Sequence, residues 1–199
     1  MKKTNLVLGL LVVLCATTAF AQTNYQIVNK IHLEGNGGWD YLTMDDASSR
    51  LYVSHGSVVQ VIDVTKKSVI ATIPDTKGVH GIALATDLNK WFISNGIDTS
   101  VTIIDLKTLK FITKVKVTGN NPDAILYDPY SKKVFTFNGR SSNSTVIDAI
   151  SNKVIATIPL IGKPEFSVTD LKGKIYVNIE DKSSICVINT ATMKVEQTW

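Results

Sequence analysis

Short apolar stretches separated by turn residues occupy most of the chain beyond residue 37. Val, Ile, Thr and Tyr dominate these stretches, and none shows the 3.6-residue spacing of an amphipathic helix. One section contains four of them in a row, at 81–85, 91–95, 101–105 and 111–115. The pattern predicts an all-β fold built from short strands and tight turns.

Two sequence markers recur four times with nearly the same period. A pair of β-branched residues precedes an Asp or Asn, and successive occurrences lie 42, 43 and 41 residues apart. These marker positions are Asp63, Asp105, Asp148 and Asn189. The tetrapeptide Tyr52-Val53-Ser54-His55 recurs with its aromatic residue at Phe92, Phe135 and Tyr176, in steps of 40, 43 and 41. Two markers with one period predict a repeated four-stranded unit, the blade of a β-propeller.

The repeated tetrapeptide is a degenerate form of Tyr-Val-Thr-Asn. Together with the Val-Ile-Asp marker and the Gly-Val-His-Gly-Ile-Ala run at 78–83, it resembles the YVTN-repeat β-propeller family. The resemblance covers essentially all of residues 22–199 and implies a propeller of commonly about seven blades. The family includes binding proteins, surface antigens and enzyme-associated domains, so the resemblance is specific for fold rather than for chemistry.

Four complete blades are expected, at about 38–74, 78–116, 121–159 and 163–199. A further strand is expected at 25–33, where the sequence matches the outermost strands of the later blades. In a closed propeller such a strand completes the last blade, but the chain already fills that position in the fourth blade. We therefore predict an incomplete propeller, a fragment whose strand 25–33 belongs to a missing last blade. Four closed blades with this strand left over is the alternative.

The first 21 residues have the pattern of a bacterial secretory signal peptide. Lys2 and Lys3 precede an apolar stretch at 6–14, and Ala19-Phe20-Ala21 supplies the small residues of a cleavage site. The bulky Leu14 before Cys15 disfavours a lipid anchor. No later apolar run approaches the ~20 residues of a membrane helix. We expect an exported protein, periplasmic or extracellular, with surface association left open and no membrane span.

Composition and charge narrow the classes of partner. With 44% hydrophobic and 19% charged residues the chain is neither disordered nor collagen-like. The formal net charge is +4 and falls when Lys2 and Lys3 leave with the signal, so we do not expect a nucleic-acid partner. Cys186 then remains as the one cysteine, in an apolar run that predicts a buried thiol.

A set of polar residues recurs where the innermost strand of each blade is expected to begin. The set is Asp40, His80, Asp123 and Glu165, in steps of 40, 43 and 42. Equivalent positions in successive blades form a ring at one mouth of the central channel. Three carboxylates and an imidazole are able to bind a divalent cation or a polar ligand. No other cofactor is expected. The alternative is that each residue bonds to neighbouring backbone and only orders its loop.

Two other recurring polar positions favour structural roles. One set is His55, Asn95 and Asn138, which lie at turns before glycines, with Ile179 as the exception at the fourth equivalent position. The other set is Asp63, Asp105, Asp148 and Asn189, which each end a strand and are followed by a tight turn.

No catalytic signature such as Gly-x-Ser-x-Gly, His-Glu-x-x-His or Cys-x-x-Cys is present. We therefore interpret the chain as an exported binding or interaction module for an unknown protein or small molecule. One alternative is a lactonase-like hydrolase in which Asp40, Asp123 and Glu165 hold a metal ion and His80 is a ligand or base. A weaker alternative, suggested by some relatives in the family, is single-stranded nucleic-acid binding.

Overall fold

The computed structural model describes residues 25–199. The chain divides into two compact units, Met1–Lys30 and Ile31–Trp199. In the first unit residues 25–30 form no regular secondary structure, and the predicted signal peptide at 1–21 lies outside the described residues. The paragraphs below concern the second unit.

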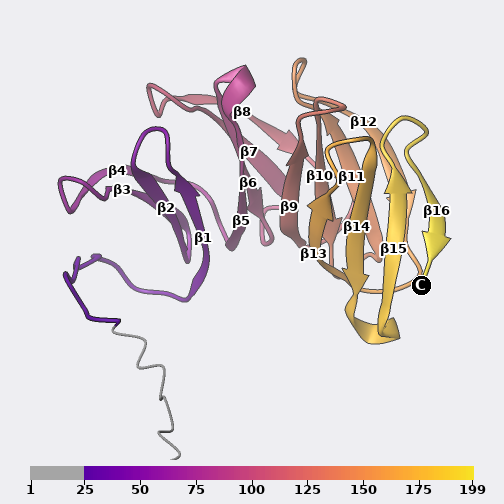
Figure 1. Cartoon of the computed structure of the whole chain (residues 1–199), viewed down its shortest axis with the longest axis horizontal. Coiled ribbons are helices and arrows are strands. Elements are labelled where there is room, and N and C mark those ends of the chain that lie inside the picture. The colour runs from indigo at the N-terminus through magenta and orange to yellow at the C-terminus, as the bar shows by residue number, and fades with distance from the viewer. Residues whose placement is uncertain (1–24) are drawn as a thin grey trace, which may run out of the picture. The chain divides into compact units, whose positions relative to one another are not determined.

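Residues 31–199 form four antiparallel sheets of four strands each, and the strands of every sheet follow chain order (Figure 1). The first sheet contains β1 (Trp39–Asp45), β2 (Arg50–His55), β3 (Val58–Asp63) and β4 (Ser68–Ile73). The second contains β5 (Val79–Ala85), β6 (Lys90–Asn95), β7 (Ser100–Asp105) and β8 (Phe111–Lys116). The third contains β9 (Pro122–Asp128), β10 (Lys133–Asn138), β11 (Asn143–Asp148) and β12 (Lys153–Pro159). The fourth contains β13 (Pro164–Thr169), β14 (Lys174–Ile179), β15 (Ser184–Asn189) and β16 (Lys194–Thr198).

The predicted all-β fold with four four-stranded blades is confirmed. Helix is confined, in the described residues, to two short 3-10 turns, η1 (Thr86–Leu88) and η2 (Glu180–Lys182). None of the described helical segments is long and apolar enough to cross a membrane.

Apolar clusters between consecutive sheets hold the blades together. Tyr52 and Val61 of the first sheet pack with Trp91 of the second. Similar clusters join the second sheet to the third and the third to the fourth. The middle strands are buried on both faces, which explains why they read as nearly continuous apolar runs. Cys186 is a buried free thiol in the last cluster, as the sequence predicts.

The innermost strands of consecutive sheets lie against one another, β1 with β5, β5 with β9 and β9 with β13. Among the strands of residues 31–199, no comparable packing joins β1 to β13. The four blades therefore form an open series rather than a closed ring, and the alternative of four closed blades is not what the structure shows.

The outer strand predicted at 25–33 is not formed in the described structure, where these residues carry no strand pairing. The physical reason is that the outermost position of every sheet is already filled, by β4, β8, β12 and β16. Pairing of 25–33 with a strand outside the four blades stays a prediction.

The Asp marker has the structural role that the sequence predicts. The carboxylates of Asp63, Asp105 and Asp148 each accept a hydrogen bond from the backbone N–H three residues later, at 2.8, 2.7 and 2.7 Å. Asn189 uses its side-chain oxygen in the same way for Ala191 and Thr192. The marker therefore fixes the turn between the third and fourth strands of each blade.

Candidate functional site at the start of the innermost strands

The four predicted ring residues occupy the same position in each blade, the second residue of β1, β5, β9 and β13. Immediately after this position the pairing with the second strand shifts, for example between Trp39 and Leu42 and between Val79 and Ile82. Equivalent irregularities occur in the third and fourth sheets. Such bulges turn a side chain away from the regular pleat, so the polar residue is not held in the flat sheet.

Serine hydroxyls from the second strand hold the first two bulges in place. The Tyr41 N–H donates to Ser54 Oγ at 2.6 Å, and the Gly81 N–H donates to Ser94 Oγ at 2.8 Å. Ser94 Oγ in turn donates to the Asp123 carbonyl oxygen at 2.5 Å, which ties the second blade to the third. These serines are the third residue of the repeated tetrapeptide. We predicted no role for these serines from the sequence, although their recurrence at one position of the tetrapeptide indicates a shared role.

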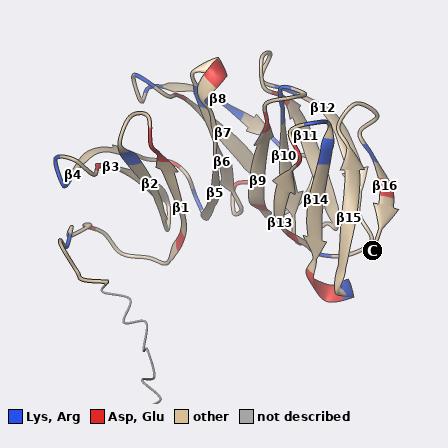
Figure 2. Ribbon diagram, viewed as in Figure 1, with Lys and Arg blue, Asp and Glu red and all other residues tan. Residues whose placement is uncertain are grey.

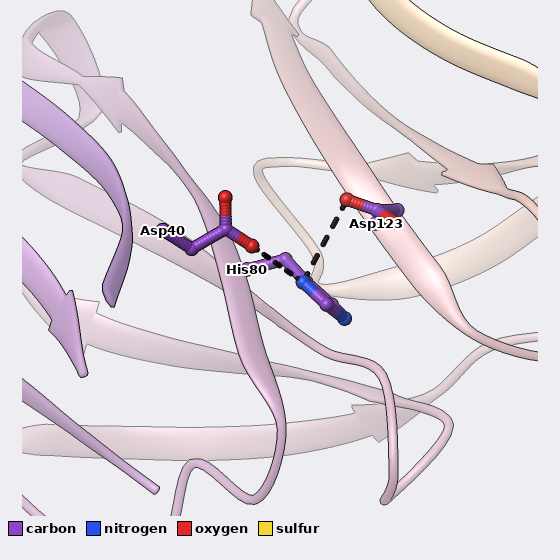
Figure 3. Close-up of side chains that lie close together, drawn as sticks. All are labelled: Asp40, His80 and Asp123. Carbon is purple, nitrogen blue, oxygen red and sulfur yellow. Dashed lines mark hydrogen bonds and ion pairs between the residues drawn. The ribbon is translucent and has the colours of Figure 1, made fainter. Parts of the chain in front are cut away.

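Three of the four predicted residues come together. His80 Nδ1 lies 2.7 Å from Asp40 Oδ2 and 3.7 Å from Asp123 Oδ1 (Figure 3). One ligand atom from each residue lies within 4.8 Å of the other two, a spacing that a single metal ion could bridge. Asp40 is exposed, whereas His80 and Asp123 are half-buried. We call Asp40, His80 and Asp123 the axial cluster.

Glu165 does not join the axial cluster. Its Oε1 lies 2.8 Å from Lys163 Nζ, and Lys163 also pairs with Glu180. The lysine two residues earlier in the loop therefore engages the carboxylate, and the predicted ring of four is corrected to a cluster of three. Glu165 remains near enough to contribute, after burial and the carboxylates of Asp123 and Asp40, to raising the pKa of Tyr41.

Gly96 leaves the space that the His80 ring occupies. A Cβ at this position would lie 2.7 Å from His80 Nε2 and 2.8 Å from Asn121 Oδ1. Gly81 plays a similar part for the neighbouring strand, since a Cβ there would lie 2.8 Å from Ile125 Cγ2. The sequence suggested only a turn for Gly96, because the contact comes from a residue in another strand.

The residues at the end of the second strands are structural, as predicted. Asn95 donates from Nδ2 to Thr102 Oγ1 at 2.8 Å, and Asn138 donates to Thr145 Oγ1 at 3.0 Å. His55 is buried and stacks on Trp39, with ring centroids 3.7 Å apart. These side chains brace strand pairs and the start of β1 instead of joining the axial cluster.

An apolar groove runs along the innermost strands beyond the axial cluster. It has a volume of about 410 Å³, and its walls come from all four sheets. Lining residues include Tyr41, Thr43, Ile82, Ile125 and Phe166. Tyr41 follows Asp40 in the chain, so the groove begins beside the cluster.

Four-stranded antiparallel blades that pack face to face, with their innermost strands side by side, define a β-propeller architecture. A solved structure with the same arrangement is "Kuenenia stuttgartiensis Hydrazine Synthase", which superposes with a TM-score of 0.74 at 18% sequence identity. The match covers 86% of this chain and 51% of that chain, so this chain spans about half of the neighbour's length. At this identity the likeness shows the fold alone. No protein-family model and no curated protein sequence matches the chain.

Proposed function

We propose that the chain is an exported propeller of the YVTN-repeat type that binds a divalent cation, or a small ligand through that cation, at the axial cluster. The observation that carries this proposal is the convergence of Asp40, His80 and Asp123 from three consecutive blades to within 4.8 Å of one another.

The donor set suits a divalent transition-metal ion. Two carboxylate oxygens and one imidazole nitrogen are common ligands for Zn²⁺ and Mn²⁺, and the imidazole makes a pure Ca²⁺ or Mg²⁺ site less favourable. Three protein ligands leave at least one coordination position for water or for a bound molecule. The apolar groove that starts at Tyr41 would then receive the less polar part of that molecule.

The local structure supports the YVTN assignment within this proposal. Ser54 and Ser94, at the third position of the degenerate tetrapeptide, bond to the bulges that follow the axial residues. Asn95, at the fourth position, braces the adjacent strand pair. The side chains of the repeated motif thus stabilise the backbone next to the proposed site. Export rests on the pattern of residues 1–21, and the periplasm or the cell exterior is the proposed location.

A metal-assisted hydrolase is the second candidate, favoured by the open coordination position that three protein ligands would leave. In that case Asp40 and Asp123 would hold the ion, and His80 would be a third ligand or a base. The charge distribution gives no comparable support to nucleic-acid binding. Figure 2 shows Lys, Arg, Asp and Glu intermixed over the described strands and loops, without a continuous basic stripe.

Calorimetric titration of the purified, metal-free chain with Zn²⁺ and with Mn²⁺ tests the proposal. We expect one ion per chain, and at least a 10-fold weaker affinity in Asp123→Asn and in Asp40→Asn. Asp46→Asn is the matched control, because Asp46 is exposed in the turn after β1, and it should bind as the unaltered chain does.

Absence of binding, or equal affinity in all four proteins, would show that the axial cluster is only an ion pair and that the proposal is wrong. Lactone hydrolysis that requires the bound ion would select the hydrolase over the binding module.

A further inference from the structure

One edge of the His80 ring faces away from the two carboxylates of the axial cluster. Its Nδ1 lies between Asp40 and Asp123, and Figure 3 shows the other ring nitrogen, Nε2, pointing away from both of them. A neutral imidazole carries one proton, so the nitrogen that binds a cation leaves this proton on the other nitrogen. A cation held through Nδ1 therefore requires an acceptor for an Nε2–H group.

Asn121 places an amide oxygen at this edge of the ring. A Cβ at Gly96 would lie 2.7 Å from His80 Nε2 and 2.8 Å from Asn121 Oδ1, so both atoms border the same small space above Gly96. While Nδ1–H is bonded to Asp40, Nε2 and Oδ1 each carry a lone pair and cannot hydrogen-bond to each other. A proton on Nε2 would turn these two acceptors into a donor and an acceptor.

The Asn121 amide is oriented by a second contact. Its Nδ2 donates a long hydrogen bond, 3.5 Å, to Asp123 Oδ2. Because a carboxylate only accepts hydrogen bonds, this contact requires the amide nitrogen on the side of Asp123 and the amide oxygen on the side of Gly96. The other carboxylate oxygen, Asp123 Oδ1, is the one that lies 3.7 Å from His80 Nδ1. One amide therefore lies against two of the three axial side chains.

The backbone holds this amide in place. Asn121 has a left-handed φ of 54°, which Asn adopts more readily than most other residues. Its carbonyl oxygen accepts the Gly139 N–H at 3.1 Å, and the N–H of Asn120 donates to Ser141 Oγ at 2.6 Å. Gly78, at the equivalent position of the second blade, is also left-handed, with a φ of 63°. The position therefore requires this backbone conformation, and the third blade adds an amide to it.

We infer that Asn121 is a positioning residue for the cation site, whose Oδ1 accepts Nε2–H of His80 and so holds the tautomer that presents the Nδ1 lone pair to the cation. The inference rests on the proposed function, cation binding at the axial cluster. Histidine ligands of metal ions usually donate their other ring N–H to such an acceptor, and its loss costs about 10- to 100-fold in affinity. Asn121, His80, Gly96 and Asp123 belong to the second and third blades, so the arrangement does not depend on what adjoins the first or the fourth blade.

Asn121→Gly removes the amide and keeps the backbone, because glycine adopts the left-handed conformation freely and already occupies the equivalent position 78. In calorimetric titration we expect Zn²⁺ to bind this variant about 10-fold or more weakly than the unaltered chain. Ser49→Gly is the matched control, because Ser49 has a left-handed φ of 53° in the turn that follows β1, beyond the end that carries Asp40. This control should bind Zn²⁺ as the unaltered chain does.

Nitrogen-15 NMR of the histidine rings gives a readout that a change in stability alone does not move. In the Zn²⁺-loaded chain we expect His80 to carry the ion on Nδ1 and a proton on Nε2 that is protected from exchange with water. In Asn121→Gly saturated with Zn²⁺, the signal of this protected proton should be lost. Comparison with His80→Gln assigns the signals of His80 and separates them from those of His32 and His55.

Equal Zn²⁺ affinity in Asn121→Gly and the unaltered chain would overturn the inference and leave the proposed function in place. Zn²⁺ bound to Nε2, with the proton on Nδ1, would overturn it in the same way. Absence of Zn²⁺ binding by the unaltered chain would instead contradict the proposed function, and the inference with it.

Discussion

His80 holds its position through two different constraints. Asp40 accepts or shares the proton of Nδ1 at 2.7 Å, and the missing side chain of Gly96 makes room for the other edge of the ring. In the tautomer with Nδ1–H bonded to Asp40, the free lone pair lies on Nε2, at the edge of the ring that faces Gly96. A cation that binds through Nδ1 would therefore compete with the hydrogen bond from His80 to Asp40, and the two carboxylates would have to rearrange around it.

Gly96→Ala should weaken cation binding by about 10-fold and lower stability by about 1–2 kcal/mol, because the new Cβ would displace the His80 ring. Calorimetric titration and urea unfolding would measure the two effects. Gly38→Ala is the control, since a Cβ there would meet no atom within 4 Å. An unchanged affinity in Gly96→Ala would mean that the position of the His80 ring does not matter for binding.

At the scale of the elements, the turns after the third strands depend on a charged carboxylate. The backbone N–H and the hydroxyl of Ser151 bond to Asp148 and lower its pKa below the ordinary 3.8. Because the folded-state pKa is the lower one, the carboxylate stabilises the fold above about pH 4. That contribution disappears as the pH falls through the folded-state pKa.

Asp148→Asn should keep the turn and reduce the acid sensitivity of the fold. Asn189 already makes the same kind of turn in the fourth blade, so the amide can replace the carboxylate as acceptor. Between pH 6 and pH 3 the variant should lose less stability than the unaltered chain, by up to about 1 kcal/mol after solvent screening. Urea unfolding at a series of pH values measures this. An identical pH profile would show that the Asp148 carboxylate contributes nothing to acid unfolding.

The elements were predictable because their signals are local and repeated. The period of Asp63, Asp105, Asp148 and Asn189 places the third strand of each blade, and the turn residues between the markers place the other strands. The bulges after the axial residues were not predictable, because they depend on bonds such as Gly81 N–H to Ser94 Oγ. The ion pair between Glu165 and Lys163 was not predicted, because repeat position alone does not reveal which charged side chain lies nearest.

The lack of strand pairing in the segment 25–33 has a physical reason that applies to any strand. Its sequence is that of an outermost strand, but a strand forms only where a neighbour offers free backbone groups. The four sheets of residues 31–199 each already have an outermost strand, so this segment has no partner among them, as expected from the sequence.

In the molecule as a whole, most of the large, fully buried side chains lie in the joints between blades. Phe135→Ala should cost about 3–5 kcal/mol, because the ring is fully buried between the third and fourth blades. Tyr176→Ala, at the equivalent position of the fourth blade, should cost less than about 2 kcal/mol, because Tyr176 is only half-buried. Urea unfolding makes the comparison. Equal costs would show that burial between two blades does not set the contribution of this repeat position.

Our proposal requires that Asp40, His80 and Asp123 form a binding site rather than an ion pair. Anomalous X-ray diffraction from crystals of the chain grown with Zn²⁺ tests it most directly. We expect one strong peak among the three side chains, at about 2.0–2.2 Å from a carboxylate oxygen of each aspartate and a nitrogen of His80. The absence of a peak there, with the 2.7 Å contact between His80 and Asp40 unchanged, would contradict the proposed binding site.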